Sequence, residues 1–394
     1  MTRQQTRVVV IGGGYAGILA ANQLRSNEDV AVTVVNPRPQ FVERIRLHQL
    51  AAGTAGATAD YGPLLANGIR LVVDTARRID TAGRSVQLAS GDALGYDYLV
   101  YAVGSTGTVP DTVPGAADFA SPLAELEQAE RVRGALDQLP RDAWVTVVGA
   151  GLTGIEVATE LAERGRRVTL VCGGRIGPAH LSDPGRRSVA KAMARLGVTV
   201  LETEVVTEVR DGAVVFADGA VRPSGLTIWT AGFGVPDLAA ASGMRTDAVG
   251  RLLTDETLTS IDDHRIVAAG DCAAPSGQAL RMCCASATQL GPQAANTVLS
   301  RIAGDPAAAL QYALPGSCTS LGRRAGLLQF TRRDDTPVDL YIGGRVAASL
   351  KEAICKGTLW GLRRAARTPG SGFWLAGGPR PTTSAFGAEA VAQS

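Results

Sequence analysis

The feature that most constrains the fold is a unit of strand, glycine-rich turn, helix and second strand that occurs twice in the chain. The first copy begins with "RVVVIGGGYAGILAANQL" (residues 7–24) and the second with "WVTVVGAGLTGIEVATEL" (144–161). In each copy, an apolar run typical of a buried parallel strand precedes a G-x-G-x-x-G spacing and then apolar residues at helical spacing. The second strands are "VAVTVVN" (30–36) and "RVTLV" (167–171). One isolated spacing is a weak signal, but two in their full context are a strong one.

Each glycine of the repeated turn has a physical task. The first allows a tight turn, the second lets a pyrophosphate approach the backbone, and the third lets the helix pack closely on the strand. The N-terminus of the helix then faces the phosphates. The residues are Gly12, Gly14 and Gly17 in the first copy and Gly149, Gly151 and Gly154 in the second. Two dinucleotide sites in one chain indicate an electron relay between a bound flavin and a visiting nicotinamide.

Three further segments extend the pattern. They are "YDYLVYAVGS" (96–105), "LTIWTAGFG" (226–234) and "HRIVAAGDCA" (264–273). With the two repeats, they make the chain resemble the two-dinucleotide-binding flavoproteins of the pyridine nucleotide:disulfide oxidoreductase superfamily over about residues 7–345. The chain resembles the type II NADH dehydrogenase-like branch most, because "CTSLGRRAGLLQF" (318–330) and "ASATQLGPQAA" (285–295) are similar to patterns of that branch.

The resemblance implies an α/β fold with two Rossmann-like dinucleotide-binding domains, one for FAD and one for NADH or NADPH, and a small C-terminal α+β region. The FAD domain is expected to be discontinuous, at residues 1–110 and 250–315. The NAD(P)H domain would be inserted at 111–249, after a linker rich in proline, glycine and aspartate. Residues 316–394 would form an interface region that ends in a mobile tail from 369. Three further glycines are expected to contact the cofactors: Gly104, Gly232 and Gly270.

Five side chains are candidates for the flavin site. Asn36 stands where a ribose-binding carboxylate is expected, about 20 residues after the third glycine, although it also suits a turn before a proline. Asp271 follows a buried strand and a glycine, so it is suited to accept a hydrogen bond from a ribityl hydroxyl or to cap a helix. The resemblance places Arg44, Arg46 and His48 beside the isoalloxazine, where a cation or an imidazole stabilises reduced flavin. A basic helix surface is the alternative for the two arginines.

Two side chains are candidates for the nicotinamide site. Glu156 falls in the first turn of the second repeat's helix, where any carboxylate favours the helix dipole. The resemblance places it near the nicotinamide, where it would orient the carboxamide or relay a proton. The second strand of this unit ends at Cys172 without a carboxylate for the ribose hydroxyls, and Arg175 follows. These residues favour NADPH, or weak discrimination between NADPH and NADH.

The fate of the electrons divides this superfamily. No cysteine occurs before Cys172 and no C-x-x-C occurs in the chain, so neither dithiol that the resemblance leads us to look for is present. The pair Cys283–Cys284 remains, in "RMCCASATQLG" (281–291). We expect this pair to begin a helix beside the flavin and to pack there, with a redox-active dithiol as the alternative. Gln289 resembles a glutamine of the quinone-reducing branch, which indicates a quinone-like acceptor.

Composition excludes several other functions. The formal net charge is only +2, so no nucleic-acid partner is expected. The three histidines lack ligand spacing, so no metal site is predicted. No apolar run reaches a membrane-spanning length and no signal peptide precedes the first strand, which predicts a cytoplasmic protein. A basic helix with a tryptophan at 350–368 suits the inner face of the membrane, a packed position on the body or a homodimer interface.

The sequence therefore predicts an FAD-dependent oxidoreductase that passes hydride from NADH or NADPH to the flavin and then to a small, quinone-like acceptor. We expect Glu156, His48 and Gln289 to act in catalysis. Two alternatives remain open. One is a tailoring oxidase or monooxygenase that acts on a small metabolite, and the other is a reductase that delivers electrons to a partner protein.

Overall fold

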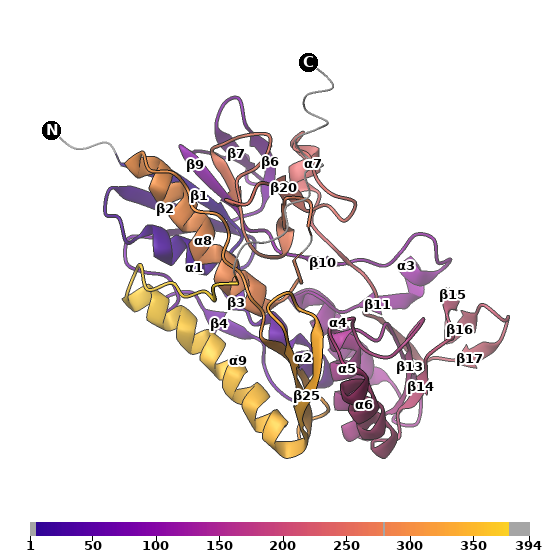
Figure 1. Ribbon diagram of the computed structural model, residues 1–394. Helices are drawn as coiled ribbons and strands as arrows, with labels where there is room; N and C mark the ends of the chain where they lie inside the picture. The colour runs from indigo at the N-terminus through magenta and orange to yellow at the C-terminus, as the bar shows by residue number, and fades with distance from the viewer. Residues whose placement is uncertain (1–4, 279, 378–394) are drawn as a thin grey trace, which may run out of the picture.

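The first of two parallel sheets carries the first glycine-rich turn. The computed structural model describes residues 5–278 and 280–377. Five parallel strands lie in the order β21-β9-β1-β2-β5. Their bounds are β1 Thr6–Ile11, β2 Val30–Asn36, β5 Arg70–Val73, β9 Tyr98–Tyr101 and β21 Ile266–Ala268. Helices α1 (Tyr15–Leu24) and α8 (Cys284–Ala303) pack against each other beside this sheet (Figure 1).

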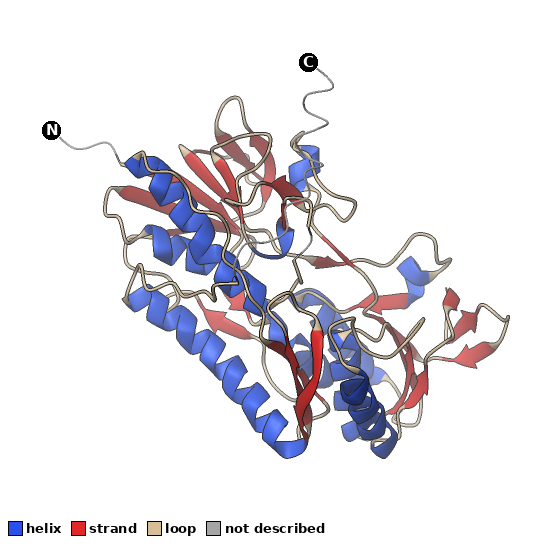
Figure 2. Ribbon diagram, viewed as in Figure 1, coloured by secondary structure: helices blue, strands red, loops and turns tan. Residues whose placement is uncertain are grey.

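The second parallel sheet carries the second glycine-rich turn. Its five strands lie in the order β11-β18-β12-β13-β14. Their bounds are β11 Ala120–Pro122, β12 Trp144–Val148, β13 Arg167–Val171, β14 Thr199–Leu201 and β18 Leu226–Trp229. Three helices accompany the sheet (Figure 2): α4 Leu126–Gln138, α5 Leu152–Glu163 and α6 Asp183–Arg195. The predicted α/β class with two Rossmann-like units is confirmed.

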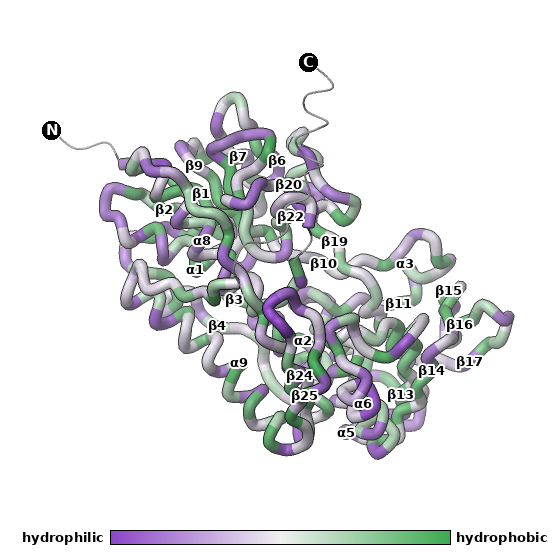
Figure 3. Tube along the Cα trace, in the orientation of Figure 1, coloured by the Kyte–Doolittle hydropathy of each residue, from purple (hydrophilic) through white to green (hydrophobic). Residues whose placement is uncertain are grey.

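Burial explains why these segments become strands. Every residue of β1 from Val8 to Ile11 is buried, and in β12 the side chains of Val145 and Val147 are fully buried. Continuous burial is what a parallel strand covered on both faces requires. The strands of the first sheet accordingly carry hydrophobic colours in Figure 3.

Smaller elements complete the two units. Antiparallel pairs and ribbons are formed by β3 (Gln40–Val42) with β4 (Thr58–Asp60), by β6 (Ala76–Asp80), β7 (Ser85–Leu88) and β8 (Ala93–Gly95), and by β15 (Val206–Arg210), β16 (Ala213–Phe216) and β17 (Val221–Pro223). Strands β20 (Leu252–Thr254) and β22 (Ala273–Pro275) pair in parallel. The short helices are α2 (Leu47–Ala52), α3 (Ala116–Phe119) and α7 (Leu238–Ala241), with 3-10 turns at Arg44–Arg46 and Gly270–Cys272. Helix α2 matters most for the site, because it packs against α4 and α5 of the second unit.

Two short strands mark the passages between the units. The chain leaves the first sheet after β9 through β10 (Thr106–Gly107) and comes back through β19 (Phe233–Gly234). The two strands pair antiparallel, so both passages run side by side. This arrangement agrees with an inserted second unit, while the domain limits named above stay predictions.

The C-terminal region lies across both units (Figure 1). Strands β23 (Gly316–Ser320), β24 (Gly326–Thr331) and β25 (Pro337–Gly343) form an antiparallel sheet that contacts α5 and α6. The long helix α9 (Gly344–Arg367) packs on this sheet and on α1. The predicted helix over 350–368 thus begins earlier, at Gly344. Within the described residues, no helix combines the length and the apolarity needed to cross a bilayer.

The part of the predicted tail that the structure describes, residues 369–377, contacts the rest of the protein, while its mobility stays a prediction. The backbone N–H of Gly372 donates to the side-chain oxygen of Gln23, at 3.1 Å, and that of Leu375 donates to Gln289 Oε1, at 3.0 Å. These bonds fix the segment against α1 and α8. The remainder of the predicted tail, 378–394, lies outside the described residues.

Candidate functional site

The first glycine-rich turn combines two crowded positions with one open position. Gly12 has a φ of +106°, and a Cβ there would lie 2.2 Å from the carbonyl oxygen of Ala102. A Cβ on Gly17 would lie 1.8 Å from the carbonyl oxygen of Gly12. A Cβ on Gly14 would meet nothing within 4 Å. The first and third glycines are therefore required by packing, whereas the second leaves room beside the N-terminus of α1 for a ligand.

The second turn repeats this arrangement. Gly149 has a φ of +105°, and its Cβ would lie 2.6 Å from the backbone nitrogen of Ala231. A Cβ on Gly154 would lie 1.9 Å from the carbonyl oxygen of Gly149, while one on Gly151 would meet nothing within 4 Å. Two cradles with the same stereochemistry, each at the start of a helix, fit two dinucleotides.

Asn36 supports the first turn from the end of β2. Its Oδ1 accepts a hydrogen bond from the backbone N–H of Gly13, at 3.0 Å, and its amide group donates to the carbonyl of Arg38, at 2.8 Å. The hydroxyl of Tyr61 donates to the carbonyl of Gly13, at 2.8 Å. Sequence reasoning missed Tyr61, because its contact with the turn is long-range. A ribose contact for Asn36 stays a prediction beside this structural role.

Asp271 offers a buried carboxylate oxygen to the first site. Its Oδ2 accepts a hydrogen bond from Ser105 Oγ, at 2.7 Å, while its Oδ1 is buried with no partner among the described residues. Arg44 binds the same segment, because its Nη1 donates to the carbonyl of Ser105, at 2.6 Å. Asp271 does not cap α8, which begins only at Cys284. An unpaired buried carboxylate oxygen is costly unless a ligand donates to it, and a flavin ribityl hydroxyl fits that need.

Two predicted cofactor-binding glycines, which precede Ser105 and Asp271, adopt backbone conformations with positive φ. Gly104, which precedes Ser105, has a φ of +76°, and Gly270, which precedes Asp271, has a φ of +80°. Gly232, at the matching place in the second unit, has a φ of +85°. The residues of the first site thus fit FAD, although contacts of these glycines with a cofactor stay predictions.

Two predicted catalytic residues, His48 and Glu156, lie together in a buried cluster. His48 Nδ1 on α2 lies 3.5 Å from Glu156 Oε2 on α5. Glu156 Oε1 lies 3.0 Å from Nζ of Lys351 on α9 and accepts a hydrogen bond from the backbone N–H of Ser320, at 3.0 Å. The Lys351 ammonium also donates to the carbonyl of Cys318, at 3.2 Å. Sequence reasoning missed Lys351, because its contact with Glu156 is long-range and the position of its helix was left open.

The electrostatics of this cluster are dominated by burial and by the ion pair. Burial lowers the pKa of His48 to about 4, although the negative charge of Glu156 raises it in part. The imidazole is therefore neutral at neutral pH. Burial alone would raise the pKa of Glu156, but Lys351, His48 and the Ser320 N–H together hold it below its ordinary value. Burial opposes the charge of Lys351 as well, yet Glu156 raises its pKa. The cluster therefore contains an ionised pair and a neutral imidazole whose Nε2 is buried without a partner among the described residues.

Arg46 is not part of a basic surface, which corrects that alternative. It is only 9% exposed, and its guanidinium lies 3.1 Å from Glu352 on α9 and 3.4 Å from Glu43. Its Nη1 also donates to Gln49 Oε1, at 3.0 Å. Arg46 thus ties α2 to α9 beside the His48 cluster.

Gln289 is engaged by the backbone instead of facing a ligand. Its amide group donates to the carbonyls of Ala285 and Ala313, and its Oε1 accepts the Leu375 N–H. The structure does not join it to His48 and Glu156 through any contact among the described residues. A catalytic role for Gln289 has no support from these bonds.

The adjacent cysteines begin α8, as predicted. Cys283 is the residue that precedes the first turn, and its thiol lies 3.2 Å from Ser286 Oγ. Both cysteines are free thiols. Burial raises the pKa of Cys284 to about 12, so that side chain remains a neutral thiol at neutral pH. These features favour packing over a redox-active dithiol.

The segment after β14 brings two glutamates beside the end of β13, and sequence reasoning missed them. The N–H of Gly173, next to Cys172, donates to the backbone carbonyl of Glu204, at 3.2 Å. The N–H of Gly174 likewise donates to the carbonyl of Glu202, at 2.5 Å, so both glutamates lie beside this turn. Burial and then the charges of Glu202 and Glu204 raise the pKa of Cys172 to about 12. Arg175, expected to bind a 2'-phosphate, instead forms an ion pair with Asp183. The turn after β13 therefore has two nearby glutamates and a paired Arg175, whereas the sequence alone indicated an unpaired arginine and no carboxylate, the pattern that favoured NADPH.

Two dinucleotide cradles, a flavin-compatible carboxylate and a buried proton-bearing cluster define a flavin-dependent oxidoreductase that uses FAD and a nicotinamide dinucleotide. Residues 6–297 match the pyridine nucleotide-disulphide oxidoreductase family, and the chain belongs to this family.

Relatives extend the likeness beyond the matched segment. The chain is 26% identical over 375 residues to the NADH dehydrogenase-like protein YutJ of Bacillus subtilis, covering 90% of this chain and 98% of that protein. It is 25% identical over 389 residues to the type II NADH:quinone oxidoreductase of Haemophilus influenzae, covering 83% and 87%. Among solved structures, the sulfide:quinone oxidoreductase of Aquifex aeolicus has the same fold, with a TM-score of 0.78, 21% identity and coverage of 92% and 93%.

Proposed function

We propose that this enzyme oxidises NADH and reduces a quinone. The reaction consumes one NADH, one proton and one quinone and yields NAD⁺ and a quinol, so atoms and electrons balance. When bound, FAD supplies the two-electron chemistry that links donor and acceptor. The task left to the chain is to hold the two nucleotides and to deliver a proton where the acceptor is reduced.

The buried cluster of His48, Glu156 and Lys351 carries this proposal. Reduction of a quinone to a quinol requires protons, and the cluster provides proton-bearing groups away from bulk water. Glu156 holds the ammonium of Lys351 charged and lies against the imidazole of His48. Lys351 also lines a solvent-open cavity, so a proton that leaves the cluster is replaceable from water.

NADH is the favoured donor because of charge. Glu202 and Glu204 lie near the end of β13, where a 2'-phosphate of NADPH would meet their negative charges. Arg175 cannot offset this charge fully, because Asp183 already pairs with it. NADH is also the donor in the names of the relatives from Bacillus subtilis and Haemophilus influenzae.

We further propose that α9 rests on a membrane surface, where quinones reside. Helix α9 exposes several large apolar side chains at helical spacing. Val346 is 61% exposed, Ile354 is 43% exposed and Trp360 is 63% exposed. Exposed basic residues such as Lys356 and Arg363 lie on the same helix. An apolar face bordered by cations and containing tryptophan suits an anionic bilayer.

The central test separates the two half-reactions in an anaerobic stopped-flow experiment. NADH should bleach the flavin, and menadione should then restore its absorbance. We expect Glu156→Gln to slow the menadione phase by about tenfold, or about 1.4 kcal/mol of barrier, with the NADH phase nearly unchanged. Glu130→Gln, an exposed carboxylate on α4, is the matched control. His48→Gln should reproduce the defect without changing the charge on Glu156.

Two results would overturn the proposal. One is a flavin that NADH does not bleach, and the other is a menadione phase that is equal in Glu156→Gln, His48→Gln and the control. The membrane part is tested by cosedimentation with phosphatidylglycerol vesicles. Ile354→Ser with Trp360→Ser should abolish it, whereas Phe119→Ser, which alters a 48% exposed side chain on α3, should not.

A further inference from the structure

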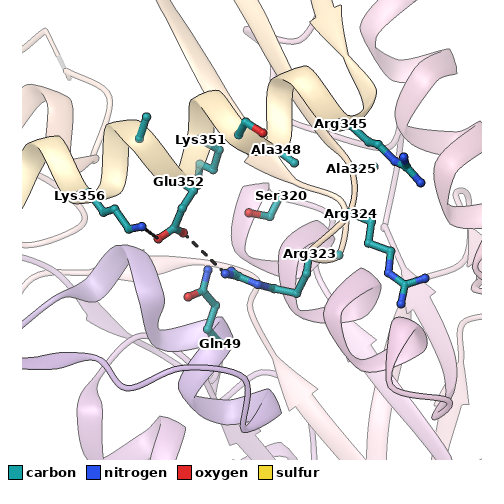
Figure 4. A pocket seen from close by; sticks show the side chains of 13 residues that line it. Gln49, Ser320, Arg323, Arg324, Ala325, Arg345, Ala348, Lys351, Glu352 and Lys356 are labelled. Atoms are coloured by element: carbon teal, nitrogen blue, oxygen red, sulfur yellow. Dashed lines mark ion pairs between the residues drawn. The ribbon is translucent and has the colours of Figure 1, made fainter.

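A cavity of about 620 Å³ lies between α9, the turn that joins β23 to β24, and Gln49 of α2. This volume lies in the range of small-molecule sites. Figure 4 shows Arg323 and Arg324 on the turn, and Lys351, Glu352 and Lys356 along α9. The cavity lies apart from both glycine-rich turns, because no residue of either turn lines the cavity. The cavity is therefore a separate site from the two cradles.

The lining of this cavity has an excess of positive charge. The lining contains one carboxylate, Glu352, and five cationic residues: Arg323, Arg324, Arg345, Lys351 and Lys356. The charge of Lys351 is already paired with Glu156, which leaves four cations beside Glu352. Glu352 is shared among three cations, because it lies 3.1 Å from Arg46, 3.6 Å from Arg323 and 3.8 Å from Lys356. Positive charges inside a concave surface reinforce one another and attract anions.

Two of the arginines have no internal counter-ion. Within the described part of the chain, neither Arg324 nor Arg345 forms an ion pair or a side-chain hydrogen bond. Figure 4 shows both side chains extending to the side of the turn away from Glu352. Arginine presents a planar fork of donors that suits phosphate oxygens, so these two groups are available for one.

The wall that carries Arg323 and Arg324 is held in place. The backbone N–H of Arg323 donates to Glu163 Oε2 of α5, at 2.6 Å, and the N–H of Leu321 donates to the carbonyl of Ala325, at 2.9 Å. Gly322 has a φ of +74°, and a Cβ there would lie 2.9 Å from the Glu163 carboxyl carbon. A fixed wall lowers the entropy cost of binding, since little of it must be ordered by the ligand.

We propose that this cavity binds a phosphate-bearing ligand through Arg324 and Arg345. The ligand chemistry is a phosphate mono- or diester, and two sources could offer it. One is a soluble phosphorylated molecule. The other is the headgroup of an anionic phospholipid, because the exposed apolar face of α9 borders the cavity and would accompany the acyl chains.

The test measures binding of pyrophosphate to the FAD-loaded enzyme by calorimetry, with saturating NAD⁺ to fill the nicotinamide cradle. We expect saturable binding of one pyrophosphate, weakened about tenfold or more in Arg324→Ala/Arg345→Ala. The matched control is Arg187→Ala/Arg195→Ala, which removes two exposed arginines from α6. Because the two pocket arginines have no internal partner, flavin content and melting temperature should be unchanged in both variants.

A vesicle arm identifies the source of the phosphate. If binding to phosphatidylglycerol vesicles falls with the pocket variant and not with the control, the natural ligand is a lipid headgroup. If vesicle binding is unchanged while pyrophosphate binding falls, it is a soluble phosphate ester. If wild type, pocket variant and control bind both probes equally, or none binds either, the proposal is wrong. The pyrophosphate readout depends neither on quinone reduction nor on membrane binding by α9, so it tests this proposal separately from the proposed function.

Discussion

Replacing Lys351 with methionine removes one partner of the buried ion pair while keeping the volume of the side chain. The Lys351 and Glu156 side chains are only 11% and 10% exposed, and their charged atoms are 3.0 Å apart. Loss of one member of such a pair costs about 3–5 kcal/mol, because the other charge stays buried without compensation. We therefore expect Lys351→Met to lose about that much free energy of unfolding near neutral pH.

The pH dependence of this loss has a definite sign. In the wild type, the pKa of Glu156 is held below its ordinary value of 4.5, so its contribution to stability is present above 4.5 and is lost as the pH falls through the lowered value. The pKa of Lys351 is raised above 10.5, so its contribution is present below 10.5 and is lost at higher pH. In Lys351→Met, burial should instead raise the pKa of Glu156. The variant should then lose stability as the pH rises through that value, so its deficit shrinks in acid.

Urea unfolding of the FAD-loaded enzyme, followed by flavin fluorescence between about pH 4 and pH 8, measures this deficit. Lys351→Met/Glu156→Gln should recover a large part of it, because the uncompensated charge is gone. Lys356→Met, whose side chain is 73% exposed, is the control and should change stability by less than about 0.5 kcal/mol. A deficit below about 1 kcal/mol, or one that does not vary with pH, would refute the reasoning.

Three further predictions concern the cofactor sites. Gly154→Ala should lower the melting temperature, because its Cβ would lie 1.9 Å from a carbonyl oxygen. Gly151→Ala should melt like the wild type, because its Cβ meets nothing within 4 Å, but it should raise the KM for NADH. Thermal melts and steady-state kinetics distinguish the two variants. Asp271→Ala should weaken flavin retention by about tenfold, the effect of losing a charge-assisted hydrogen bond, and the flavin-to-protein absorbance ratio after dialysis measures this. Glu202→Gln/Glu204→Gln should raise kcat/KM for NADPH relative to NADH by about fivefold or more, and an unchanged ratio would contradict the charge argument.

The sequence predicts the local parts of the structure well because their signals are local. Strands β2 and β13 have the predicted bounds, Val30–Asn36 and Arg167–Val171, since continuous apolar runs determine buried parallel strands. The glycine roles were predictable for the same reason. Contacts between distant segments were not. Ser105 meets Asp271 because they follow β9 and β21, which are neighbours in the first sheet, and Lys351 meets Glu156 because α9 lies across both units. No spacing in the sequence encodes either approach.

The structure also bears on where the electrons go. A thiol becomes a nucleophile when a nearby cation stabilises its thiolate. Near Cys284 the available cation is Lys351, but its ammonium is already held by Glu156 and by the carbonyl of Cys318. Burial consequently dominates at Cys284 and keeps it protonated. The ion pair with Glu156 thus keeps the Lys351 ammonium from stabilising a thiolate at Cys284, and this agrees with a packing role for that side chain.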